Sequence, residues 1–237
     1  MNVRKTIYKF NHLEMFRVQA YGDSAVLIEF GTEINEQTRL EILSFTEQLK
    51  EDKIEGVINW IPAYTTLVIV YDVFRISFLQ LKRELEKVQI KVQDLGLGRL
   101  VRIPVCYDTK FSLDIEAVML QTGLSKDEII ELHTAPEYQV HMLGFVPGFF
   151  YLGGLDTRLH CGRKEKPRIK IEAGAVGIAG SQTGVYPLES PGGWQLLGKT
   201  PIAIFDKDRK DRPFYVRQGD RVQFYEITLE QYKQFCI

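Results

Sequence analysis

The stretch from His141 to Asp206 holds twelve of the nineteen glycines in the chain and five of its nine prolines. Glycine adopts positive φ angles at little cost, whereas proline fixes φ and lacks a backbone donor, so regular helices are disfavoured there. Short apolar runs, such as Val176 to Ala179 and Ile202 to Phe205, lie between these turn residues and are typical of short strands. The stretch therefore predicts a small closed β-structure, of which a barrel is the natural form.

Length and composition suit one large domain or two ordinary ones, and we expect two. The chain has 237 residues, 45% of them hydrophobic, and is long enough for two separate cores. Thirty basic and 31 acidic side chains leave a net charge of −1, which favours neither nucleic acid nor a membrane surface as the main partner. The cysteines Cys106, Cys161 and Cys236 form no CxxC pair, as is typical of a reducing compartment. We therefore expect a cytoplasmic protein without a signal peptide or membrane span.

The first part of the chain shows the pattern of a small α+β sandwich domain, residues 1–95. Two strand-like runs, FRVQAY and AVLIEF, flank the turn residues Gly22 and Asp23, which predicts a hairpin. A helix is expected after the N-cap candidate Asn35, followed by the strands VINWIP and TLVIVY. Ser77 then caps a second helix with heptad-like apolar spacing. The order β-β-α-β-β-α indicates two layers.

A glycine-containing patch, Asp94 to Arg99, marks the expected boundary, so the second domain covers residues 96–237. It opens with the strand-like run RLVRIPVCY and continues with a helix expected over Ser112 to Thr122. A second helix begins at the capping box Ser125 to Glu128. The remainder predicts strands and turns, including a late hairpin around Gly219-Asp220. The fold class is therefore α+β, a small sandwich followed by a β-barrel.

Familiar catalytic motifs are absent or lie in the wrong context. The segment Gly193 to Thr200 matches the pattern GxxxxGK[ST] of a phosphate-binding loop. Such a loop needs a strand before it and a helix after it. Here the turn residues Ser190-Pro191-Gly192 precede the segment, and Pro201 and a strand-like run follow it. We therefore interpret it as a chance match. Ser181 does not occupy the central position of a GxSxG nucleophile elbow. The histidines and cysteines show neither HExxH nor a four-ligand spacing, so no metal is predicted.

Three polar residues within the glycine-rich stretch are candidate catalytic residues. His141 can act as a general base or donor near neutral pH, although a lone histidine is more often structural. Arg168 follows Pro167 and can clamp a carboxylate or phosphate with two hydrogen bonds, or can be an ordinary surface charge. Gln182 lies in a glycine-flanked turn and can donate to a carbonyl or oxyanion, or can simply stabilise the turn.

Aromatic residues in the same stretch suggest a binding surface. An apolar pocket with a few convergent polar groups suits a small ligand or a proline-bearing peptide. The simpler alternative is that these rings form the core, since aromatic side chains dominate the interiors of small barrels. The candidate binding residues are Phe145, Pro147, Tyr151, Tyr186 and Trp194.

Four motifs carry a resemblance to a known family. They are GDSAVLIEFG, PAYTTLVIVYD, HMLGFVPGFFYLGGLD and AGAVGIAGSQTGVYPLESPGGWQLLGKTPIAIFD. With them the chain, from Phe16 to Tyr225, resembles the family of the B subunit of 5-oxoprolinase, also described as the kinase A inhibitor of sporulation and as allophanate hydrolase subunit 1. The family is similar to one part of the carboxyltransferase domain of urea carboxylase. The resemblance implies a cyclophilin-like C-terminal barrel; it does not imply prolyl isomerisation, because a fold does not fix a function.

The resemblance implies two functions of different classes. In the first, the chain is a subunit of an ATP-dependent enzyme that opens the lactam of 5-oxoproline to give glutamate, together with subunits A and C. Arg168 would then hold the substrate carboxylate, Gln182 or His141 would polarise the reacting carbonyl, and partner subunits would carry ATP. In the second, the chain binds the dimerisation helices of a sensor histidine kinase and blocks autophosphorylation. A third alternative is a module that only assembles a complex.

Overall fold

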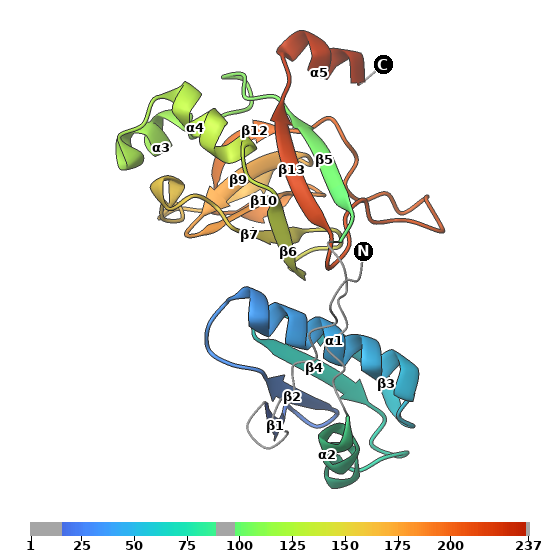
Figure 1. Cartoon of the computed structure of the whole chain (residues 1–237). Helices are drawn as coiled ribbons and strands as arrows, with labels where there is room; N and C mark the ends of the chain where they lie inside the picture. The colour runs from blue at the N-terminus through green and yellow to red at the C-terminus, as the bar shows by residue number, and fades with distance from the viewer. Residues whose placement is uncertain (1–15, 89–97, 236–237) are drawn as a thin grey trace, which may run out of the picture. The chain divides into compact units, whose positions relative to one another are not determined.

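The computed structural model describes residues 16–88 and 98–235. Its contacts divide the chain into two compact units, Met1–Gly96 and Leu97–Ile237 (Figure 1). Each unit has its own cluster of buried hydrophobic residues. The boundary expected between residues 95 and 96 lies outside the described residues, so its position stays a prediction.

The first unit has the expected element order and a four-stranded antiparallel sheet with strand order β1-β2-β4-β3. Alternate residues of β2 and β4 are buried, and they share one core cluster with residues of both helices. Because alternate residues of a strand point to one face, both helices cover the same face of the sheet. The two-layer sandwich is therefore confirmed. Its elements are β1 (Arg17–Ala20), β2 (Ala25–Glu29), α1 (Glu36–Asp52), β3 (Val57–Pro62), β4 (Thr66–Tyr71) and α2 (Phe78–Lys87).

Local sequence signals explain where these elements begin and end. Gly22 has a φ of 66° in the turn of the β1-β2 hairpin, a conformation that glycine adopts readily. The Asn35 side chain accepts a hydrogen bond from the backbone N–H of Thr38 and caps α1. Ser77 and Gln80 form a reciprocal capping box at α2. The predicted hairpin and both predicted caps are confirmed.

The second unit contains a seven-stranded sheet, with strand order β12-β9-β10-β7-β6-β13-β5, and a two-stranded sheet, β11-β8 (Figure 1). Helices and short connections complete it. Its elements are β5 (Leu100–Val105), α3 (Ile115–Thr122), α4 (Lys126–Thr134), β6 (Tyr138–Leu143), β7 (Phe150–Gly153), η1 (Thr157–Leu159), β8 (Arg168–Ile171), β9 (Ala175–Ala179), β10 (Gln182–Val185), β11 (Ser190–Gly192), β12 (Gln195–Lys199), β13 (Arg221–Glu226) and α5 (Leu229–Phe235).

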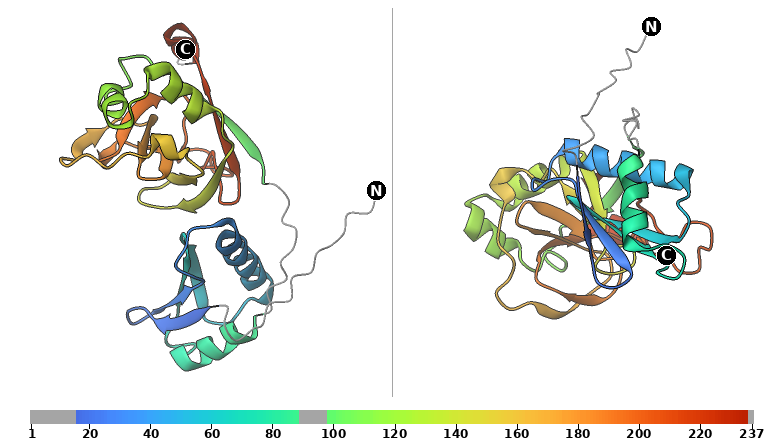
Figure 2. Two further views of the ribbon diagram at one scale, coloured as in Figure 1. Left: turned by 60° about the vertical axis from the view of Figure 1, so that its left-hand side comes forward. Right: turned by 90° about the horizontal axis from the view of Figure 1, so that it is seen from below.

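The seven-stranded sheet curls into the expected barrel, which is nearly closed. Just beyond β5, Cys106 pairs with Lys199 at the end of β12, and their backbone groups exchange hydrogen bonds of 2.9 and 3.0 Å. The first and last strands of the sheet are thereby joined at one end, which protects their edges. In Figures 1 and 2 the helices α3 and α4 lie against the barrel, and the buried Val118 and Ile129 of these helices belong to the barrel's core cluster.

Two predictions about strands in the second unit are wrong. Ile202 to Phe205 forms no named strand; Phe205 makes only an isolated bridge with Phe214. No hairpin forms around Gly219-Asp220, because β13 pairs in parallel with β5 and antiparallel with β6. Both edges of β13 are therefore occupied by strands that lie far away in the sequence. The preceding segment has no free edge with which to pair.

The start of α3 also differs from the prediction. The helix begins at Ile115, three residues later than the expected Ser112. Asp114 is its N-cap, but its side chain makes no capping hydrogen bond. By contrast, the predicted capping box of Ser125 and Glu128 is present at α4. The Asp114 carboxylate is engaged elsewhere, at the centre of the polar network described below.

Candidate functional site

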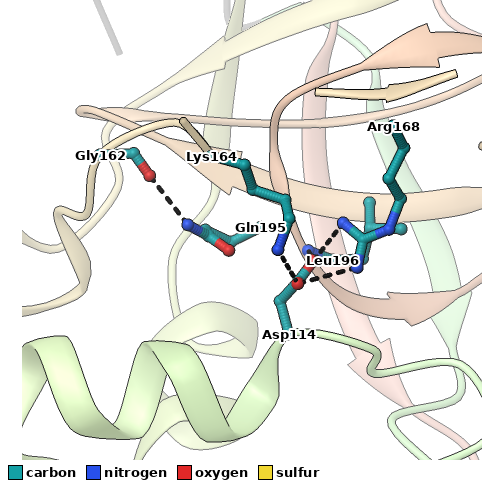
Figure 3. A network of polar contacts seen from close by, with 6 residues as sticks. All are labelled: Asp114, Gly162, Lys164, Arg168, Gln195 and Leu196. Carbon is teal, nitrogen blue, oxygen red and sulfur yellow. Dashed lines mark hydrogen bonds and ion pairs between the residues drawn. The ribbon is translucent and has the colours of Figure 1, made fainter. Parts of the chain in front are cut away.

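Asp114 is the centre of a buried polar network (Figure 3). Its side chain is 2% exposed and accepts hydrogen bonds from both terminal nitrogens of Arg168, at 2.8 and 2.9 Å. Lys164 Nζ donates to the same carboxylate at 2.7 Å, and the backbone N–H of Leu196 donates at 2.8 Å. The network thus ties the start of α3 to the strands β8 and β12 and to the segment that contains Lys164.

Electrostatics keep Asp114 ionised. Burial alone would raise the pKa of this carboxyl group, but hydrogen bonds from Arg168, Leu196 and Lys164 outweigh burial and hold the pKa below its usual value. Two cations therefore face one carboxylate. The fork of Arg168, which we expected to clamp a substrate carboxylate, already holds the carboxylate of Asp114 in this structure. A catalytic role of Arg168 stays a prediction.

The loop of residues 162–167, which precedes β8, is fastened on both sides of Arg163. The carbonyl of Gly162 accepts a hydrogen bond from Gln195 Nε2 at 3.1 Å (Figure 3). The backbone N–H of Lys164 donates to the carbonyl of Gly193 at 2.7 Å. Because the partners lie on either side of Trp194, the loop runs alongside that residue. The backbone of Arg163 is therefore held while its side chain is exposed.

A cluster of aromatic rings includes Trp194, the residue beside this loop. Phe149 is 1% exposed and occupies the middle of the cluster. Its ring centroid lies 4.7 Å from that of Tyr151, 5.3 Å from that of Tyr186 and 5.4 Å from that of Trp194. Edge-to-face and tilted contacts at these separations are favourable between aromatic rings. This cluster is separate from the barrel's interior core, but it is itself a buried core: Tyr186 is 2% and Trp194 4% exposed. The simpler interpretation of the rings as core residues is therefore confirmed for Phe149, Tyr186 and Trp194.

The strand register explains why the aromatic cluster lies on the outer face of the barrel. Thr183 of β10 pairs with Leu152 of β7, and both are fully buried, with Leu152 in the interior core. The neighbouring pair, Gly184 and Tyr151, must point to the opposite face. A Cβ atom at Gly184 would lie 3.3 Å from the Trp194 ring. The outer face of β7 and β10 therefore carries the aromatic cluster.

His141 and Gln182 lie on this same outer face. Continuing the β10-β7 register by one residue places Gln182 opposite Gly153. His141 lies at an irregularity of β6, between Val140 and Met142, and a Cβ atom at Gly153 would lie only 2.1 Å from His141 Nε2. The imidazole thus occupies the space above Gly153. Since cross-strand neighbours share a face, the His141 and Gln182 side chains lie on the same side of the sheet.

Phe145 is the exposed member of the aromatic group. Its side chain is 57% exposed, although its ring still contacts Phe149 with a centroid separation of 5.6 Å. Its φ is 73°, a conformation that a bulky residue rarely adopts. Pro147, two residues later in the same turn, is also exposed. Backbone strain of this kind is characteristic of functional sites.

Burial changes the chemistry of the two tyrosines. It raises the pKa of Tyr186 to about 12, although a backbone hydrogen bond from Trp194 and the positive charge of Arg163 oppose the rise. Burial also raises the pKa of Tyr151, again against the charge of Arg163. Both phenols are therefore neutral at physiological pH. Neutral phenols can donate a hydrogen bond to a ligand.

Sequence reasoning found most of these residues but missed Asp114, Lys164 and Arg163. Asp114 was included in an expected helix, where an acidic residue near the first turn is an ordinary helix-dipole partner. Lys164 and Arg163 belong to a run of basic residues, and no local signal separates a paired cation from a free one. Only the fold brings residues 114 and 168 together.

The chance interpretation of the GxxxxGK[ST] match is confirmed. Residues Gln195–Lys199 form the strand β12 instead of a loop that opens a helix. Lys199, which would contact phosphates in a true phosphate-binding loop, is paired with Glu172. These residues therefore do not fit a nucleotide. In residues 16–88 and 98–235, no group of three potential metal ligands comes together. In the same ranges, no helix is both long and apolar enough to cross a membrane.

Comparisons with known proteins agree with this architecture. The family described as carboxyltransferase domain, subdomains C and D, matches residues 16–216. A curated relative from Bacillus subtilis (strain 168), named as the B subunit of 5-oxoprolinase, is 41% identical over 232 residues, covering 93% of this chain and 96% of the relative.

Solved structures also match this chain over most of its length. The crystal structure of TTHA0988 is 38% identical with a TM-score of 0.77, and the match covers 86% of this chain but only 40% of that longer chain. The urea amidolyase of Kluyveromyces lactis has a TM-score of 0.79 at 20% identity, covering 95% of this chain and 16% of that protein, so it supports the fold alone. The chain therefore belongs to the family of carboxyltransferase subdomains C and D and is a homologue of the B subunit of 5-oxoprolinase.

Proposed function

We propose that this chain is the B subunit of an ATP-dependent 5-oxoprolinase, which hydrolyses 5-oxo-L-proline to L-glutamate. The observation that carries the proposal is the 41% identity to a protein named as the B subunit of 5-oxoprolinase, over nearly the full length of both chains. A name that specifies a subunit implies partner subunits, and we assign that role to subunits A and C. We further place the complex in the cytoplasm, since Cys106 and Cys161 are buried free thiols.

The outer face of the barrel supplies groups that suit a small cyclic amide. His141 and Gln182 lie on one face, where their side chains can donate hydrogen bonds to the lactam carbonyl and to the oxyanion that develops from it. The exposed Phe145 and the tyrosine Tyr151 provide apolar surface for the ring. Arg168 keeps the neighbouring loop in place through Asp114. The role of this chain is therefore to bind and orient the lactam.

ATP chemistry is assigned to the partner subunits. Hydrolysis of a stable lactam is coupled to ATP in the proposed reaction, whereas the GxxxxGK[ST] segment of this chain is a strand with Lys199 paired to Glu172. The isolated chain is accordingly expected to be inactive. Its contribution would appear only in the assembled complex.

The test is glutamate formation from 5-oxoproline with ATP, using the chain mixed with partner subunits and with each component omitted in turn. The proposal predicts that omission of this chain abolishes turnover. Full activity without it, or turnover by the chain alone, would overturn the proposal. Inhibition of a sensor histidine kinase, the second function implied by the resemblance, is favoured by no particular feature of the described residues and stays a prediction.

A further inference from the structure

Arg163 differs from three of the basic residues near it in the sequence, Lys164, Arg168 and Lys170. Lys164 and Arg168 are bound to Asp114, and Lys170 is paired with Glu189 at 2.7 Å. Within the described ranges, no carboxylate forms an ion pair with Arg163, whose side chain is exposed. An arginine without a partner keeps its full fork of donors available for a carboxylate or a phosphate.

The backbone on either side of Arg163 is fixed, so its position is defined. Gln195 holds the carbonyl of Gly162, and the carbonyl of Gly193 holds the N–H of Lys164. Asp114 adds a second attachment through the Lys164 side chain. A guanidinium that starts from a fixed backbone loses less conformational freedom on binding a ligand than one on a free loop.

Arg163 lies beside the aromatic cluster, because its chain neighbours Gly162 and Lys164 are hydrogen-bonded to the residues on either side of Trp194. The positive charge of Arg163 opposes the rise in pKa of Tyr151 and Tyr186, in agreement with this position. Tyr151 projects from the outer face of β7, the face that also carries His141 and Gln182. The strained and exposed Phe145 lies at the edge of the same cluster. The outer face of the barrel thus groups Arg163, aromatic surface, and the side chains of His141 and Gln182, which can donate hydrogen bonds to a carbonyl.

We infer that Arg163, and not Arg168, binds the carboxylate of a small cyclic substrate whose ring rests on Phe145 and Tyr151. The role rests on the proposed function, which names 5-oxoproline as that substrate. A ligand held by its carboxylate at Arg163 presents its remaining polar atoms to the face that bears His141 and Gln182. Arg168 is less suited to this task, because the fork of its two terminal nitrogens already holds the carboxylate of Asp114.

The experiment measures KM and kcat for 5-oxoproline in the reconstituted complex with Arg163→Ala, Arg163→Lys and Lys166→Ala. Loss of a charged hydrogen-bonding partner predicts a rise in KM of about ten- to a hundredfold for Arg163→Ala. Arg163→Lys keeps the charge but loses the fork, so its KM should lie between those of the wild type and Arg163→Ala. Lys166, exposed in the same loop, is the matched control, and its variant should retain the wild-type KM.

A neutral analogue separates carboxylate recognition from general damage to the site. The wild-type complex should be inhibited more strongly by a cyclic carboxylate such as tetrahydrofuran-2-carboxylate than by its neutral amide, tetrahydrofuran-2-carboxamide, whereas the Arg163→Ala complex should lose this preference. Arg163 has no described ion pair, so the urea midpoint of the variant chain should remain that of the wild type.

The outcomes distinguish this inference from the proposed function. If the complex without this chain is fully active, the proposed function fails and the role of Arg163 fails with it. If activity requires this chain but Arg163→Ala keeps the wild-type KM and the preference for the acid, the role of Arg163 alone is overturned. If Lys166→Ala raises KM as much as Arg163→Ala does, the effect arises from the overall positive charge of the loop and not from a specific contact of Arg163. This result would also overturn the role of Arg163.

Discussion

Asp114 and Arg168 lie 54 residues apart in the sequence and meet in a two-pronged ion pair, with N–O distances of 2.8 and 2.9 Å. The carboxylate is almost fully buried, whereas the Arg168 side chain is 23% exposed. The pair explains two features at once. Because the carboxylate of Asp114 binds Arg168, it does not cap α3. The ion pair also fixes the strand β8 against the start of α3.

Asp114→Asn should destabilise the second unit by about 2 kcal/mol. Removing one partner of a fully buried ion pair costs about 3–5 kcal/mol, but Arg168 and Lys164 are partly exposed, so solvent reduces the penalty. Urea unfolding would measure the change. Glu189→Gln, which breaks the exposed pair with Lys170, is the matched control and should leave the midpoint unchanged. Equal midpoints for both variants would contradict a stabilising role of the network.

Much of the first unit can be predicted from the sequence because its signals are local. The Gly22-Asp23 turn, the Asn35 cap and the Ser77 capping box each depend on residues within a few positions of one another. The hairpin expected around Gly219-Asp220 failed for the opposite reason. Strand β13 is held by β5 and β6, which no local pattern reveals.

In the candidate site, too, the sequence indicates residue types, whereas contacts between distant segments appear only in the structure. The residue types of His141 and Gln182 marked them in the sequence, but only the register of β10 on β7 shows that they share a face. The pairing of Arg168 with Asp114 depends on a contact between distant segments. A string of basic residues does not show which cation is already paired, so the sequence does not single out Arg163.

His133 should make the chain lose stability in mild acid. Its Nε2 lies 2.8 Å from Thr183 Oγ1, which donates its own proton to the carbonyl of Gly177. Nε2 must therefore carry the imidazole proton, and Nδ1 accepts from the Tyr107 hydroxyl at 2.7 Å. Complete burial lowers the pKa of His133 to about 3.

The lowered pKa of His133 determines how the stability of the chain changes with pH. The unfolded chain takes up a proton on His133 below about pH 6.5, whereas the folded chain stays neutral down to about pH 3. The stabilisation is complete above the unfolded pKa and declines by about 1.4 kcal/mol per pH unit as the pH falls through this window. Urea unfolding of His133→Gln between pH 7 and pH 5 should lack this slope, and the exposed-site control His160→Gln should keep it. Parallel profiles for wild type and His133→Gln would contradict the assignment.

The two ends of the aromatic cluster should respond differently to truncation. Phe149 is 1% exposed and contacts four other rings, so Phe149→Ala should cost about 3–5 kcal/mol of unfolding free energy. Phe145 is 57% exposed, and Phe145→Ala should cost no more than about 1 kcal/mol. Thermal or urea unfolding would measure both. Similar large losses would show that Phe145 is a core residue and not part of a binding surface.

Gly153→Ala should impair the site without any change to a candidate catalytic residue. A Cβ atom at this position would lie 2.1 Å from His141 Nε2 and 2.3 Å from His141 Cδ2, so the imidazole must turn away. His141 is only partly buried, and its ring can move at a small cost in stability. We therefore expect turnover by the reconstituted complex to fall by about a hundredfold, which is the lower end of the rate loss caused by removing a positioned acid or base. The urea midpoint should change little.

A double-mutant cycle would show whether the loss arises through His141. If Gly153→Ala acts by displacing the imidazole, it should have no further effect on turnover in a chain that already carries His141→Ala, because nothing remains to be displaced. The two single variants and the double variant should then share one reduced rate. Additive losses would instead show that the new methyl group disturbs β7 itself, and an active Gly153→Ala complex would remove His141 from the reaction.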